Sequence, residues 1–209
     1  MRIALAGSLA LLAACGGSDG ATTEKDASAN VADMASIDDD LAMAPPGAGA
    51  ALACRSTGKN AYLTYGATAF AKVNDSIFER VSSELAANGS LNLGDSLTRV
   101  GTGVPASTAD PIGSFKGSLL AFLVYAYGGP SYLQYSDGIT YSGVRHMASA
   151  HAGLGITQAQ YSYFVTSIIV PSLVENGVLA GNGDGADDIS SCFAPVLTDP
   201  SFVDSIVGK

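Results

Sequence analysis

Two histidines, His146 and His151, are the residues of this chain best suited to holding a transition metal. A neutral imidazole is a common protein ligand for iron and other transition metals. Because the two lie five residues apart, a continuous helix would point them about 140° apart, so they could not share one face of a metal. From residue chemistry alone, a single histidine on an apolar helix is more often a hydrogen-bonded structural residue. Both interpretations stay open at this point.

His151 also belongs to a longer pattern spread over the second half of the chain. Its parts are Phe115-Lys116-Gly117, Gly128-Gly129-Pro130, Tyr141-Ser142-Gly143, Met147 four residues before His151, and the run from Gly153 through Gly155 to Ile156-Thr157. In this order they resemble the group 1 truncated haemoglobins, which are small haem-binding globins. The resemblance covers about residues 115–178 and is fainter over 62–85.

The resemblance implies an all-α, globin-like fold, a truncated two-over-two helical sandwich with long loops between its helices. It also implies a non-covalent b-type haem whose iron is held by His151 as the proximal ligand. His146 is expected in solvent or close to a haem propionate. The other residues expected around the haem are Met147, Ile156 and Tyr161 on the proximal side, and Lys116 and Arg145 as cations that face either the propionates or water.

The far side of the haem departs from the family pattern. Family members often place there a tyrosine and a glutamine that donate hydrogen bonds to a bound ligand. The corresponding positions here are Phe78 and Leu119, with Phe115 facing the ligand, and none of these side chains is a donor. The sequence leaves open whether a tyrosine from the insertion after Pro130 supplies a hydroxyl instead; the candidates are Tyr132, Tyr135 and Tyr141.

The function implied by the resemblance is binding of a diatomic gas (oxygen, nitric oxide or carbon monoxide), or electron transfer with an unknown redox partner. We expect a binding protein rather than an enzyme, because turnover of nitric oxide or peroxide would need a reductant or polar distal groups that the sequence does not identify. The alternative is a haem-free, globin-like lipoprotein that acts as a structural or interaction module. The insertions at 88–114 and 131–143 favour that alternative, and the intact motif around His151 opposes it.

The first residues are typical of an export signal. Arg2 precedes an apolar run from Ile3 to Ala14, which is too short to span a bilayer. Leu12-Ala13-Ala14-Cys15 resembles the lipobox of bacterial lipoproteins, which implies a diacylglycerol on Cys15; the alternative is an ordinary secretory signal. We therefore expect a signal peptide at 1–14 and an exported protein on the cell envelope, at the outer membrane or the periplasmic face, that meets the membrane only through its lipid anchor.

Two cysteines remain after Cys15, namely Cys54 and Cys192. In an oxidising compartment an even pair favours a disulfide, while two separate buried thiols are the alternative. A bridge across so long a loop would stabilise the fold by about 4–5 kcal/mol in the chain-entropy model. Residues 15–53 are rich in Ala, Gly, Asp and Ser, which is typical of a flexible tether. The folded domain is therefore expected at 54–209.

The net charge of the chain is −9, and it contains no block of Lys or Arg. A nucleic-acid partner needs clustered positive charge, so none is expected. The acidic loop from Asn182 to Asp188 has the composition of a calcium loop but lacks the first and last EF-hand ligands, because Ala180 and Ser191 stand there. We interpret this loop as a solvated turn.

Helical patterns must position these residues. One apolar stripe occupies every third or fourth position from Phe70 to Leu85, and a second covers residues 115–127. A short helical piece carries both histidines. Thr157-Gln158-Ala159-Gln160 is a capping box that begins another helix, which Pro171 should kink and Gly177 should end. A last helix should start at Asp199-Pro200, and no segment alternates as a strand does.

Overall fold

The computed structural model describes residues 47–97, 111–135, 138–181 and 187–209, with side chains from residue 115 onward in the second range. Most of these residues are helical, which confirms the expected class. The elements are η1 (Ala48–Ala51), α3 (Ala61–Asn88), α5 (Pro111–Ala126), β1 (Tyr132–Gln134), β2 (Thr140–Ser142), α6 (Met147–Ala150), α7 (Gln158–Tyr163), η2 (Phe164–Ile169), α8 (Val170–Glu175), η3 (Ile189–Phe193), α9 (Ala194–Leu197) and α10 (Pro200–Asp204).

Helix α3 is the longest element, and its apolar stripe faces the core as predicted. Asn60 caps it by accepting a hydrogen bond from the Leu63 amide (2.8 Å). Phe70, Val73 and Ile77 are buried, and the later members of the stripe are half-buried. Gly66 interrupts the helix with a φ of 76°, which only glycine adopts at little cost, so the first turn is offset from the rest.

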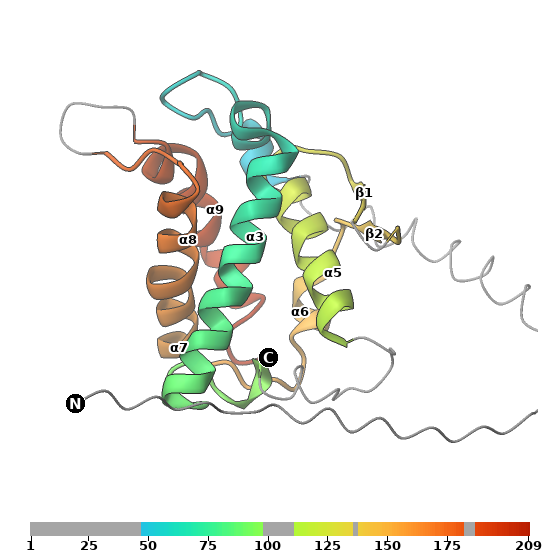
Figure 1. Ribbon diagram of the computed structural model, residues 1–209, viewed down its shortest axis with the longest axis vertical. Helices are drawn as coiled ribbons and strands as arrows, with labels where there is room; N and C mark the ends of the chain where they lie inside the picture. Colours follow the sequence, from blue (N-terminus) through green and yellow to red (C-terminus); the bar gives the residue numbers. More distant parts are fainter. Residues whose placement is uncertain (1–46, 98–110, 136–137, 182–186) are drawn as a thin grey trace, which may run out of the picture. The chain divides into compact units, whose positions relative to one another are not determined.

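Helix α3 lies between α5 on one side and α8 on the other (Figure 1). An aromatic cluster joins α3 and the end of α5 to η3. The ring centroids of Tyr127 and Phe193 are 4.8 Å apart, and Phe70 lies 5.9 Å from Tyr127. The Tyr127 hydroxyl donates to the Phe193 carbonyl (3.2 Å), so this buried phenol keeps a partner.

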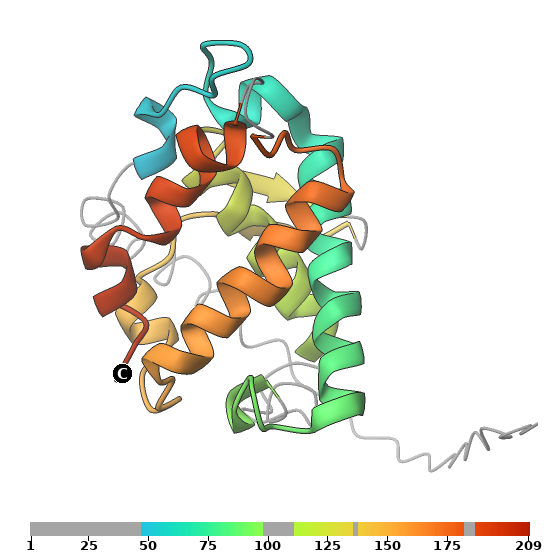
Figure 2. The same cartoon turned by 90° about the vertical axis from the view of Figure 1, so that its left-hand side faces the viewer.

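Elements α7, η2 and α8 continue as one helical run beside α3 (Figure 2). The capping box is present, since the Thr157 hydroxyl accepts from the Gln160 amide and the Gln160 side chain accepts from the Thr157 amide. A π-helical turn, η2, ends at Ile169, two residues before Pro171, and the kink expected at this proline stays a prediction. Pro171 has no amide to donate, so its own α-helical hydrogen bond is absent. The Val170 amide, one residue earlier, bonds the Val165 carbonyl five residues back, as in a π-helix.

The insertion after Pro130 contains a small antiparallel hairpin in which Tyr132 pairs with Ser142. The expected absence of strands is therefore wrong. Each strand has only three residues, which is too short for a period-two pattern to stand out in the sequence. The hairpin packs on α5: a Cβ on Gly117 would lie 2.3 Å from a ring carbon of Tyr141.

The packed chain already includes residues before Cys54, where the sequence places the start of the domain. Gly49 is buried, and a Cβ there would lie 2.8 Å from the Ala126 carbonyl oxygen. The signal peptide, Cys15 and most of the tether lie outside the described residues. Among the described helices, none combines the length and the apolar character that a membrane span requires.

Candidate functional site

His151 ends the single turn α6, and its imidazole is held by that same turn. Nδ1 lies 2.8 Å from the carbonyl oxygen of Met147, four residues earlier. A carbonyl can only accept, so Nδ1 is the donor in this hydrogen bond. In a neutral imidazole with its proton on Nδ1, Nε2 holds the lone pair that a metal requires. A histidine that binds a metal usually donates its other ring N–H to a carbonyl or carboxylate in this way.

His146 sits at the opposite end of α6, where its Nδ1 accepts a long hydrogen bond from the Ser149 amide (3.4 Å). Its side chain is exposed, as expected. The two histidines therefore take different roles: His146 caps the turn, and half-buried His151 remains the candidate ligand.

The loop after His151 is fixed by its glycines and by the end of the described chain. Gly153 and Gly155 have φ values of 74° and 63°, which favour glycine. The Gly155 amide donates to the Lys209 carbonyl, and the Gly208 amide donates to the Ile156 carbonyl, both at 2.9 Å. Figures 1 and 2 both show the C-terminal residue beside α6 and the start of α7.

A cavity of about 380 Å³ lies beside this loop. It lies between the segment that follows α3 and the segment that runs from His151 into α7. Its lining residues are Gly94, Asp95, Ser96, Leu154, Gly155 and Gln160. Within the described ranges, no three His, Cys, Asp or Glu side chains gather to hold a bare metal ion. His151 is not among the residues that line this cavity.

The three apolar residues expected on the far side come from α3 and α5. The rings of Phe78 and Phe115 meet edge to face, with centroids 5.3 Å apart, and half-buried Leu119 packs on the core. One turn before Phe78, Asn74 is fully buried and donates from Nδ2 to the Lys116 carbonyl (3.2 Å). Its Oδ1 has no partner among the described residues. Asn74 was not predicted from the sequence; the only sign of it there is an asparagine next to Val73 of the apolar stripe.

The two candidate cations have partners within the protein. Lys116 Nζ lies 2.7 Å from Asp75 Oδ1 and 5.5 Å from the centre of the Phe78 ring. The hydrogen bond to Asp75 raises the pKa of Lys116. Arg145 is exposed and donates to the Ser118 hydroxyl on α5 (2.5 Å). Asp75 therefore compensates the charge of Lys116, whereas the guanidinium of Arg145 bonds a neutral hydroxyl.

The remaining predicted residues lie around α6 and α7. Met147 and Ile156 are half-buried. Tyr161 is buried, and its hydroxyl donates to the Leu197 carbonyl (2.6 Å), so it ties α7 to α9. Burial raises the pKa of Tyr161 to about 12, which keeps the phenol protonated at physiological pH.

The hairpin tyrosines take two positions. Tyr132 is 46% exposed on β1. Tyr135 and Tyr141 face each other edge to face, with centroids 6.4 Å apart, and the Tyr141 ring covers Gly117 on α5. The prediction that one of them supplies a distal hydroxyl stays a prediction.

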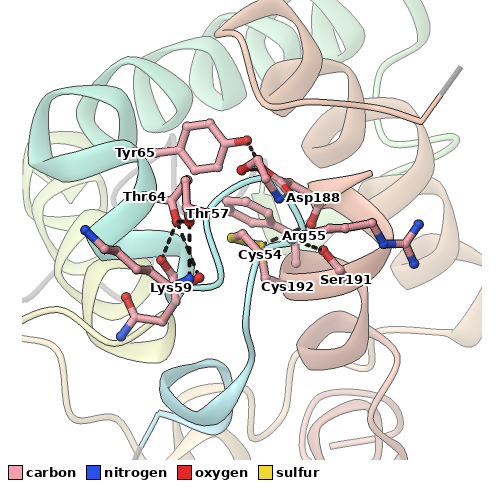
Figure 3. Close-up of a disulfide and its surroundings, with 12 residues drawn as sticks. Cys54, Arg55, Thr57, Lys59, Thr64, Tyr65, Asp188, Ser191 and Cys192 are labelled. Atoms are coloured by element: carbon pink, nitrogen blue, oxygen red, sulfur yellow. Dashed lines mark hydrogen bonds between the residues drawn. A yellow bond between two sulfur atoms is a disulfide. The ribbon is translucent and has the colours of Figure 1, made fainter. Parts of the chain in front are cut away.

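A second polar site surrounds the disulfide (Figure 3). Cys54 and Cys192 are joined, which confirms the predicted pairing, and both are fully buried. Beside them the buried carboxylate of Asp188 accepts from the Ser56 amide (2.9 Å), the Ser56 hydroxyl (2.5 Å) and the Tyr65 hydroxyl (2.6 Å). Residues 182–186 lie outside the described chain. Asp188 is buried, so the prediction that it belongs to a solvated turn is wrong. Its partners are more than 120 residues away in sequence, so no local sequence pattern predicts them.

Opposing effects set the protonation of this carboxylate. Burial raises the pKa of Asp188, but the hydrogen bonds from Ser56 and Tyr65 outweigh burial and hold that pKa below its ordinary value of 3.8. Burial and the hydrogen bond to Asp188 raise the pKa of Tyr65 to about 12. At neutral pH an ionised Asp188 therefore accepts from two neutral hydroxyls.

This geometry predicts an acid-dependent loss of stability. Because the folded pKa of Asp188 is depressed, its contribution is present above the unfolded pKa and is lost as the pH falls through the folded value. Asp188→Asn should lower the free energy of unfolding at pH 7 by about 2 kcal/mol. As the pH is lowered from about 5 into the acid range, the free energy of unfolding of the variant should fall less than that of wild type. Urea unfolding across pH measures both effects, with exposed Asp204→Asn as the control. Parallel pH profiles for wild type and Asp188→Asn would contradict the assignment.

Comparison of the chain with protein-family models, with curated proteins and with solved structures gave no match.

Proposed function

We propose that the chain is a haem-binding, truncated-haemoglobin-like globin that binds a diatomic gas at an iron held by His151. One observation carries the proposal: the hydrogen bond between His151 Nδ1 and the Met147 carbonyl at 2.8 Å. That bond fixes the ring and its tautomer, and it leaves Nε2 as the ligating nitrogen. Met147 and His151 are also the centre of the sequence pattern. The hydrogen bond and the resemblance to truncated haemoglobins therefore both point to His151.

The fold supports the proposal at a coarser level. Helix α3 packs against α5 and against the run from α7 to α8, and these are the segments from which a two-over-two globin sandwich would be built. Half-buried Phe78, Phe115 and Leu119 would supply an apolar wall that excludes water from the haem. The haem would supply the iron that binds the gas.

The haem would be held without covalent bonds. Cys54 and Cys192 are joined to each other, and Cys15 is the only other cysteine, so neither buried thiol is available for a thioether. Arg145 is the better candidate for contact with a propionate, because Asp75 already compensates Lys116.

We also propose that the protein is exported and anchored to the cell envelope through a lipid on Cys15.

Gas binding by the ferrous, haem-loaded protein tests this function. Because no donor is identified at the distal positions, oxygen should leave roughly 5- to 150-fold faster than from a globin with one such hydrogen bond, which is equivalent to about 1–3 kcal/mol. Carbon monoxide depends less on hydrogen bonding and should bind well. Leu119→Gln should slow oxygen release by about tenfold, and Val174→Gln, an exposed change on α8, should leave it unaltered. Slow release from wild type would contradict the apolar distal side and implicate a hairpin tyrosine.

The rival function is that of a haem-free structural module. It predicts that the purified chain binds neither haem nor gas. A third function, consumption of nitric oxide, would appear as turnover when the oxygenated protein is mixed rapidly with nitric oxide.

A further inference from the structure

Three asparagines of the chain are followed by glycine, the pair of residues in which asparagine most readily loses its side-chain amide. Glycine has no side chain to shield its backbone nitrogen. Asn88-Gly89 ends α3, Asn176-Gly177 follows α8, and Asn182-Gly183 lies outside the described residues. The two described pairs have the same residues, so a large difference in their reactivity must come from the fold.

In this reaction the asparagine side chain reacts with the backbone of the glycine. The glycine nitrogen loses its proton and attacks Cγ of the asparagine. The new C–N bond forms as the bond from Cγ to Nδ2 breaks, and Nδ2 leaves as ammonia. Solvent water then opens the succinimide ring at either carbonyl. The product is an aspartate, or an isoaspartate in which the main chain runs through the former side chain.

The turn that contains Asn176 is fixed to the core. Asn176 Nδ2 donates to the Ser172 carbonyl (2.8 Å), and the Val178 amide donates to the Leu173 carbonyl (3.0 Å). The side chains of Val178 and Leu173 are both buried. Attack by the Gly177 nitrogen requires this turn to open, which would draw Val178 out of the core.

The turn that contains Asn88 has no such attachment. Asn88 Nδ2 donates to Glu84 Oε1, and the Gly89 amide donates to the Leu85 carbonyl, both at 2.9 Å. Residues 88–91 are all exposed, and a Cβ on Gly89 would meet no atom within 4 Å. Opening this turn breaks two hydrogen bonds but exposes no buried side chain, so it resembles the ordinary fraying of a helix end.

Glu84 restrains the reaction at Asn88. Hydrogen bonds from Asn92, Tyr163 and Asn88 lower the pKa of Glu84, so it is ionised at neutral pH. Its carboxylate holds the Asn88 side chain back along the helix, toward the preceding turn. Its negative charge also disfavours the deprotonated Gly89 nitrogen that must attack.

Deamidation would make the contact between positions 88 and 84 repulsive. A carboxylate at position 88 would face Glu84 one turn earlier, at the negative end of the helix dipole. The same Glu84 oxygen accepts from Asn92 Nδ2 (2.7 Å), in the segment that leads to residues 94–96 at the cavity. Loss of the Asn88 donor would therefore loosen the end of α3 and the start of that segment.

We propose that Asn88 is a site of spontaneous deamidation in the folded domain, that the fold protects Asn176, and that the product keeps the end of α3 open. The proposal goes beyond the proposed function, and it is independent of haem and of the lipid anchor.

Ageing the purified full chain at neutral pH, both folded and in guanidinium chloride, tests the proposal. Mass spectrometry of its peptides measures conversion at each asparagine. Each rate in the folded chain is divided by the rate in denaturant, which removes the effect of neighbouring sequence. The resulting ratio should be at least about tenfold larger for Asn88 than for Asn176, because burial of a valine side chain is equivalent to such a factor. Equal ratios, a larger ratio for Asn176, or no conversion of Asn88 in the folded chain would overturn the assignment.

Two variants test the role of Glu84 and the effect of the product. Glu84→Ala should raise the rate at Asn88 about tenfold and leave Asn176 unaltered. Glu79→Ala, an exposed change on the same helix, is the matched control and should alter neither. Asn88→Asp reproduces one product, and amide hydrogen exchange over residues 85–92 should then be about tenfold faster than in wild type. An unchanged or lower rate in Glu84→Ala would overturn the restraint by Glu84, and unchanged exchange in Asn88→Asp would overturn the open helix end.

Discussion

Replacing Cys54 and Cys192 together by alanine should lower the free energy of unfolding by about 4–5 kcal/mol. The bridge spans 138 residues, and a covalent link across so long a loop removes much of the conformational freedom of the unfolded chain. That loss is a large part of the stability of an average domain. Both sulfurs are fully buried, so the double variant is a better test than reduction of the native protein.

Urea unfolding of the oxidised wild type and the double variant measures this difference. Cys15→Ser is the matched control, because Cys15 lies in the N-terminal segment and outside the pair, and it should unfold with the wild type. A double variant as stable as wild type would show that the bridge contributes little. Asp188 and its hydrogen bonds would then be sufficient to hold the two ends of the domain together.

His151→Gly should weaken haem binding by more than about 100-fold. Loss of a partner outside the ligand shell already reduces metal affinity by 10- to 100-fold, and this change removes the ligand itself. The structure adds a reason for specificity: the His151 Nδ1 donates to the Met147 carbonyl, whereas the Nδ1 of exposed His146 accepts from the Ser149 amide. Haem titration of the purified chain measures the affinity.

Two controls separate ligation from folding. His146→Ala removes the other imidazole and should keep wild-type affinity. Added imidazole should restore much of the haem binding to His151→Gly, because it can fill the space left by the side chain. Unchanged affinity in His151→Gly would contradict proximal ligation, and lost affinity in His146→Ala would place the iron on the other histidine.

The sequence predicted best the features that are encoded locally. The Thr157 capping box, the Asp199 cap and the stop after α5 depend on residues within one turn of each other, and all three are present. The apolar stripe on α3 also followed from spacing alone. The pairing of Cys54 with Cys192 could be predicted because, once Cys15 is set aside, two cysteines allow only one bridge.

The features that the sequence missed depend on contacts between distant segments. Asp188 looked like part of a solvated turn, and only the fold brings Ser56 and Tyr65 to it. The π-helical turn before Pro171 depends on which carbonyl each amide reaches, which residue types do not specify. The position of His151 on its turn was predicted, but the hydrogen bond that fixes its tautomer required coordinates.

The absorption spectrum of the purified chain after loading with haem tests the central claim most directly. We predict a Soret band in the ferric and ferrous states of the wild type, retained in His146→Ala and lost or strongly shifted in His151→Ala. A wild-type protein that shows no Soret band when ample haem is supplied would contradict the proposal that His151 holds a haem iron.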